Sequence, residues 1–133
     1  MKLTSRSEYA LLALVYLARN NGNGFISVET IALAQNIPPK FLEQILLVLK
    51  RAKYVRSAKG QRGGFKLAKP ADGIFLADVI RLFDGALAPT ESVSYYFYES
   101  TPIEKERRLL QVFRNIRDLV AKKLEGTSIA DVL

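Results

Sequence analysis

Apolar residues near the start of the chain predict two helices separated by a short irregular segment. Residues 7–19 are apolar on nearly every side, which is typical of a buried helix, and the Asn-Asn-Gly sequence that follows ends it. Ser27 is a favourable N-cap for a second helix over residues 28–35. Within that helix, Ile31 and Ala34 are expected to share the face that packs against the core.

A third helix is predicted over residues 39–53, and its apolar positions follow one face. Pro39 suits the first helical position, where a missing N–H costs little. The inner face carries aliphatic residues at i, i+3, i+4 and i+7, which are Leu42, Ile45, Leu46 and Leu49. The outer face carries Lys40, Glu43, Gln44 and Leu47. Two helices joined by a turn of three to four residues are typical of a helix-turn-helix.

A glycine-rich turn then lies between two strand-like segments. Residues 54–57 and 65–68 favour strands, and residues 60–64 between them read Gly-Gln-Arg-Gly-Gly. Residues 25–26 are expected to add a short strand. A helix-turn-helix followed by such a hairpin predicts a winged helix.

The second half of the chain predicts a short helix and then a segment without clear periodicity. The short helix covers residues 76–83. Its packing residues are Val79, Ile80, Leu82 and Phe83. Residues 85–101 include four consecutive aromatic side chains, Tyr95 to Tyr98. We expect these aromatic side chains to pack against the next helix, and a ligand pocket is the alternative.

The longest predicted helix covers residues 102–124, a length of about 35 Å. Thr101 and Glu104 have the spacing of a capping box, and Pro102 suits the first helical position. A narrow apolar stripe on a long, charged helix is typical of a helix–helix interface, with packing inside one subunit as the alternative. The predicted dimerisation residues are Leu109, Val112, Phe113, Ile116, Leu119 and Val120.

Charge is distributed unevenly along the 133 residues of the chain. The net charge is +7, but residues 1–70 carry twelve Lys/Arg against three Asp/Glu, whereas residues 71–133 carry eight against ten. Residues 50–69, which include the hairpin, hold eight basic residues and no acidic one. Such a stretch suits a polyanion, and double-stranded DNA is the expected partner, with a merely solvated surface as the alternative.

The elements and the charge together predict a mainly α fold with a small β-hairpin. We expect a winged helix-turn-helix DNA-binding domain over residues 1–84. A linker loop and a long C-terminal dimerisation helix are expected over residues 85–133.

The chain contains no Cys and no His. This composition excludes disulfides, cysteine-ligated clusters, ordinary zinc sites and Ser/His or Cys/His catalysis, so we expect neither an enzyme nor a metal cofactor. Gly63–Gly64 lacks the Lys-Ser/Thr pair that follows in a phosphate-binding loop. No signal peptide is recognisable and no apolar run approaches the ~20 residues that span a bilayer. A cytoplasmic protein without a membrane partner is predicted.

The outer face of the third helix carries groups that can read bases. Gln44 can bond the N6 and N7 atoms of adenine, and Glu43 can accept from cytosine N4 in the major groove. Lys59 and Arg62 at the hairpin tip are long enough to enter a minor groove. Phosphate contacts are expected from the basic residues of the helix, Lys40, Lys50 and Arg51. For Glu43 and Gln44 an ordinary surface role is the alternative.

Short motifs along nearly the whole chain form a recognisable set. They are Leu3-Thr4-Ser5, Tyr9-Ala10-Leu11, Ile31-Ala32, Phe41-Leu42-Glu43-Gln44-Ile45-Leu46, Gly60, Gly63-Gly64-Phe65, Leu67, Asp78-Val79-Ile80 and Ser128-Ile129-Ala130-Asp131. Together they resemble the Rrf-two (Rrf2) family of bacterial winged-helix regulators. The chain is similar to regulators of iron–sulfur cluster assembly, nitric oxide stress and cysteine metabolism.

This resemblance implies a homodimer that binds a partly palindromic operator. It also implies that Glu43 and Gln44 lie at base edges, that Lys59 enters the minor groove and that the long helix carries dimer contacts. Cluster-binding members of the family have three Cys before the long helix, the first near Ser92 in this numbering. Since this chain has none, an iron–sulfur sensor is not expected.

Two other segments depart from the family pattern. The hairpin tip has Gln61 and Arg62 where Gly and Pro are usual, and Phe75 replaces a Thr that commonly caps the following helix. We predict a dimeric, sequence-specific transcription regulator that acts as a repressor and responds to a small-molecule or protein effector. The alternative is a winged-helix protein-interaction module that docks an acidic partner.

Overall fold

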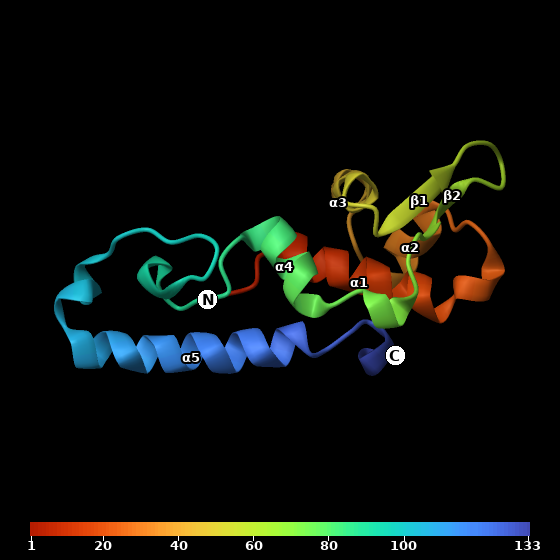
Figure 1. Ribbon diagram of the computed structural model, residues 1–133. Coiled ribbons are helices and arrows are strands. Elements are labelled where there is room, and N and C mark those ends of the chain that lie inside the picture. The colour runs from red at the N-terminus through yellow and green to blue at the C-terminus, as the bar shows by residue number, and fades with distance from the viewer.

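The computed structural model describes residues 1–133 and has five α-helices and one antiparallel hairpin, joined by loops and short 3₁₀ turns (Figure 1). In chain order the elements are α1 (Ser5–Arg19), α2 (Val28–Gln35), α3 (Pro39–Arg51), β1 (Val55–Ala58), β2 (Gly64–Leu67), α4 (Leu76–Asp84) and α5 (Arg107–Glu125). The predicted mainly α fold with a winged helix-turn-helix and a long C-terminal helix is confirmed. No helix combines the length and the apolar character that crossing a membrane requires.

Helix α1 lies at the centre of the fold and contacts α2, α3 and α4. Its buried face consists of Ser7, Ala10, Ala13, Leu14 and Leu17. The predicted inner face of α3 packs into the same core, and each of its four aliphatic side chains is at most 2% exposed. The periodic pattern therefore identified the face of α3 that holds it against α1.

Local side chains and backbone angles decide where these helices begin and end. Thr4 caps α1, which starts two residues earlier than predicted, and Ser27 caps α2 as predicted. Asn36 ends α2 in the left-handed conformation, with φ 56°. α3 ends at Arg51, not at residue 53, because Lys53 has φ 68°, which no helix can accommodate.

Two predicted packing positions are wrong. Ala34 is exposed and Ala32 is buried in its place. The side of α2 that faces the core carries Ile31 and Ala32. On α4, Leu82 is 40% exposed, whereas Ala77 is fully buried. Successive helical residues lie about 100° apart, so in both helices the mispredicted residue falls on the solvent side.

Each of the four strand bounds lies one residue from its predicted position, and Val55 pairs with Leu67. Ile26 and Phe65 exchange two backbone hydrogen bonds of 2.8 Å, so the predicted strand at residues 25–26 is one bridge. Gly64 has φ 141°, and a Cβ built on it would lie 2.1 Å from the carbonyl oxygen of Ile26. Only glycine allows this close approach, which fastens the hairpin to the helix-turn-helix.

The predicted helix over residues 102–124 is interrupted near its start. Pro102–Lys105 forms a 3₁₀ turn, and the α-helix begins only at Arg107. The predicted capping box is wrong, because the Thr101 hydroxyl donates to Ser92 and the Glu104 carboxylate accepts from two neighbouring hydroxyls. The 19 residues of α5 give a helix of about 28 Å.

The C-terminal segment returns to the winged helix. Ile129 is fully buried in the main core, and its N–H donates to the carbonyl of Ile74. The N–H of Leu76 donates to Thr127, so a backbone carbonyl takes the role of the missing side-chain cap at Phe75. α5 is thereby held against the core at its C-terminal end, while its N-terminal half projects beyond α4 (Figure 1).

Candidate nucleic-acid interface

Helix α3 presents an exposed face opposite its buried stripe, and we call it the reading face. Lys40, Gln44, Leu47 and Arg51 are all exposed and lie along one line of the helix, with Glu43 and Lys50 beside them. None of the polar side chains in this set has a side-chain hydrogen bond or an ion pair within the chain. The structure therefore brings the predicted helix residues together on one surface, with their polar groups free to bind a partner.

The hairpin tip lies on the same side of the molecule as α3, whereas α5 lies on the opposite side (Figure 1). Lys59 and Arg62 are exposed in a turn that is closed by a 3.0 Å hydrogen bond from the Gly63 N–H to the carbonyl of Gly60. Gly60 has φ 102°, a conformation that favours glycine. The tip extends two long cations away from the core.

Three other basic residues of the hairpin region contact aromatic rings. Lys66 lies 4.7 Å and Arg56 5.9 Å from the centre of the Phe25 ring. Lys69 lies 4.7 Å from the ring of Tyr54, whose pKa is raised chiefly by burial. Cation–π contacts at these distances hold side chains in place without neutralising their charge. Charge counting found these cations, but only the fold shows that aromatic rings orient them.

The positive charge on this side is not compensated by acidic neighbours. Both ion pairs of the chain, Arg81–Glu125 at 2.7 Å and Arg117–Asp118 at 2.9 Å, lie within residues 71–133. Residues 1–70 carry twelve basic and three acidic residues, a net charge of +9, and form no ion pair. A polyanion that approaches α3 and the hairpin therefore meets unpaired cations.

Helix α5 carries an apolar face that nothing in the chain covers. Four of the six predicted dimerisation residues are between 39% and 72% exposed, namely Leu109, Val112, Ile116 and Leu119. Phe113 and Val120 are half-buried. Only Leu110 and Ala121 of this helix are buried, on the side that faces the loop and α4.

The aromatic run contacts α5 but is not buried by it. The Tyr95 hydroxyl donates to Asp118, and Arg117 lies 4.0 Å from the Tyr95 ring. This hydrogen bond raises the pKa of Tyr95 and lowers the pKa of Asp118. All four aromatic side chains remain at least 45% exposed, and Tyr95 and Tyr96 also line an open pocket of about 560 Å³.

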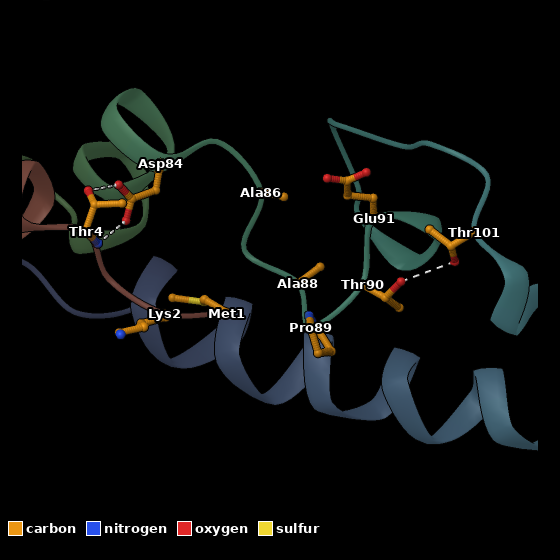
Figure 2. Close-up of a pocket in the computed structure, with 10 residues that line it drawn as sticks. All are labelled: Met1, Lys2, Thr4, Asp84, Ala86, Ala88, Pro89, Thr90, Glu91 and Thr101. Atoms are coloured by element: carbon orange, nitrogen blue, oxygen red, sulfur yellow. Dashed lines mark hydrogen bonds between the residues drawn. The ribbon is translucent and has the colours of Figure 1, made fainter.

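A separate open pocket of about 440 Å³ lies where the N-terminal segment meets the end of α4 (Figure 2). Figure 2 shows Thr4 paired with Asp84 at one end and Thr90 with Thr101 at the other, with Met1 and Lys2 between them. The lining is polar and carries charges of both signs, and the chain has no His or Cys to pair with a nucleophile there. The pocket offers binding groups but no familiar catalytic pair.

Comparison with known proteins agrees with this architecture. A family model described as Rrf2, iron-dependent transcriptional regulator, matches residues 3–133. The Mycobacterium tuberculosis protein Rv1287 is 36% identical over 136 residues, covering 99% of this chain and 81% of that one. The HTH-type transcriptional regulator CymR of Bacillus subtilis is 30% identical, covering 99% of this chain and 89% of CymR.

Solved structures share the whole fold. The structure of CymR, the global cysteine regulator of B. subtilis, superposes with a TM-score of 0.80 and covers 99% of this chain and 95% of that chain. The structure of T. potens IscR gives a TM-score of 0.76 at 26% identity, covering 99% of this chain and 85% of that chain.

The residues of this chain do not fit the iron that the family description names. The chain has neither Cys nor His, and no group of three or more acidic residues is arranged to hold a metal ion. Near the position where cluster-binding relatives are expected to begin their cysteine set, the Ser92 hydroxyl accepts from Thr101 at 2.6 Å. Hydroxyls bonded to one another are poor ligands for an iron–sulfur cluster.

Proposed function

This chain belongs to the Rrf2 family of DNA-binding transcription regulators, and from that premise we propose that it is a homodimeric repressor of a partly palindromic operator. The observation that best supports this proposal is the unpaired reading face of α3, which lies on the same side as the cationic hairpin tip. Both surfaces belong to the half of the chain that has a net charge of +9, twelve basic minus three acidic residues.

The residue roles follow from hydrogen-bonding capacity. Gln44 and Glu43 would read adenine and cytosine edges in the major groove. Lys59 and Arg62 would enter the flanking minor groove. The remaining basic residues of α3, Lys40, Lys50 and Arg51, would bind phosphates and fix the register.

The dimer would form through the exposed apolar face of α5. One winged helix reads one half-site, so two copies related by a two-fold axis are matched to a palindrome. In this arrangement residues 1–84 bind DNA, and residues 85–133 supply the linker and the dimer contacts. The pocket in Figure 2 touches both parts, through Asp84 on one side and Thr90 on the other, so a small-molecule effector bound there would contact both. A protein effector is the second candidate.

The test is to select DNA from a random duplex library and then measure the salt dependence of binding to the selected sequence. We expect an imperfect palindrome, and an affinity that falls about 10³–10⁵-fold between about 50 and 200 mM salt for 6–10 phosphate contacts. A reporter gene placed behind the operator should be less active when the protein is present. Failure to enrich any sequence, combined with capture of an acidic protein domain, would favour the protein-interaction module.

A further inference from the structure

Leu47 is the one aliphatic side chain on the central line of the reading face. It is 45% exposed, and it lies between Gln44 on one side and Arg51 on the other. The apolar residues that hold α3 against α1 lie on the opposite side of the helix. Leu47 therefore adds nothing to the stripe that packs α3, and it faces the same partner as Gln44.

The chemistry of the major groove limits what an aliphatic side chain can contact there. Every base presents hydrogen-bond donors or acceptors in the major groove, and thymine alone adds a C5-methyl group beside its O4 acceptor. Leu47 placed against a polar edge would displace water without supplying a hydrogen bond, which is unfavourable. Placed against the thymine methyl, it would bury apolar surface on both sides.

We propose that Leu47 selects thymine, through contact with its C5-methyl group, at the base pair next to the one that Gln44 reads. This inference rests on the proposed function, because it requires α3 to lie in the major groove. Leu47 follows Gln44 by three positions, a rise of about 4.5 Å along the helix, which is close to the ~3.4 Å between base pairs. The two side chains therefore address adjacent steps.

Leu47 should disfavour cytosine as well as favour thymine. A cytosine at the same position presents an amino group to Leu47, and that donor stays unpaired once water leaves. A thymine is thereby favoured over a cytosine at the position that faces Leu47.

The experiment uses operator duplexes selected from a random library by the wild-type protein. Each thymine of a half-site is replaced in turn by deoxyuridine, which differs only in lacking the C5-methyl group. We expect one replacement, adjacent to the base pair whose preference Gln44→Ala relaxes, to weaken binding about fourfold, as removal of one buried carbon implies. In Leu47→Ala the same replacement should change affinity less than twofold.

Two further variants make the comparison specific. Leu33→Ala removes an 87% exposed leucine from α2, outside the reading face, and should keep the full response to deoxyuridine. Leu47→Met keeps an apolar side chain of similar volume and should retain most of the response to deoxyuridine. Thermal unfolding of all variants should match the wild type, since both leucines are exposed.

The outcomes separate the two proposals. If no sequence is selected, the proposed DNA-binding function fails. If an operator is selected but the response to deoxyuridine is the same with and without Leu47, or no thymine lies beside the Gln44 position, only the thymine contact is overturned.

Discussion

Single residues of the reading face and the hairpin tip differ in whether they could distinguish one base from another. A side-chain amide such as Gln44 both donates and accepts, so it can match one pattern of base-edge groups and fail to match others. An ammonium group such as Lys59 only donates, and a phosphate accepts from it whatever the sequence. Since both side chains are exposed and unpaired, each can be removed without disturbing the core.

Substitution of these two residues should therefore have different consequences. Gln44→Ala is expected to cost about 1–3 kcal/mol on the preferred operator and to relax preference at one position in each half-site. Lys59→Ala should weaken binding to all duplexes by a similar factor and lower the slope of the salt dependence by about 1 per protomer. Titration against a panel of single-base operator variants at several salt concentrations measures both effects. Equal scaling on every duplex by both variants would contradict the assignment.

What the sequence could predict at this scale depended on whether an interaction is local. The Ser27 cap and the buried leucines of α3 follow from spacing within one helix, and both were found. The placement of Arg56 and Lys66 against Phe25 joins residues about thirty to forty positions apart, so no local pattern reports it. Local patterns also do not report the contact of Thr101, because its hydroxyl donates to Ser92, outside the helix it was expected to cap. The expected capping box is therefore not formed.

Among the elements, the hairpin depends on one close backbone approach. Gly64→Ala should destabilise the protein by about 1–3 kcal/mol or more, because the new Cβ would lie 2.1 Å from the Ile26 carbonyl oxygen at φ 141°. Thermal unfolding measures the loss, and operator affinity should fall as the tip is displaced. Gly73→Ala is the matched control, since its Cβ meets nothing within 4 Å and its φ is unremarkable. Equal stability of the two variants would mean that the hairpin is not held in this way.

The loop before α5 is held by hydrogen bonds to carboxylates, so its stability depends on pH. The hydrogen bond from Tyr95, and then Arg117, lower the pKa of Asp118 below its ordinary value. A lowered pKa in the folded state means that the contact stabilises the loop above the ordinary Asp pKa of ~3.9 and is lost as the pH falls through the lowered value. The raised pKa of Tyr95 keeps its hydroxyl a donor throughout the neutral range.

Asp118→Ala should therefore speed amide hydrogen exchange in residues 94–101 at pH 7. The difference from the wild type should shrink at a pH below the lowered pKa, where the wild-type carboxyl is also neutral. Asp72→Ala, in the exposed 3₁₀ turn before α4, is the control and should leave this loop unchanged. A loop that exchanges equally fast in wild type and Asp118→Ala at pH 7 would show that the contact does not hold it.

Over the whole molecule, the two candidate interaction surfaces lie on opposite sides. One side carries α3 and the hairpin, and the opposite side carries α5 (Figure 1). On α5, Leu109, Val112, Ile116 and Leu119 are exposed. The sequence predicted both surfaces, because charge density and helical periodicity can be counted along the chain. It did not predict that Ile129 returns to the core and ties the C-terminal segment to the winged helix, since that packing joins distant segments. Because Ile129 is anchored in the core, it orients α5 relative to the winged helix.

Under the proposed function, dimer formation and operator affinity should depend on each other. Ile116 and Leu119 are 39% and 72% exposed on α5, where charges placed by Ile116→Asp and Leu119→Asp would be desolvated in a dimer but not in a monomer. The double variant should sediment as a folded monomer, and it should bind a full operator no more tightly than a single half-site. Val132→Asp, at a 43% exposed position outside α5, should remain dimeric and bind normally. A double variant that stays dimeric would show that another surface joins the protomers. A monomer with full operator affinity would show that the two half-sites are read independently, because linked binding requires both winged helices to be held at one spacing.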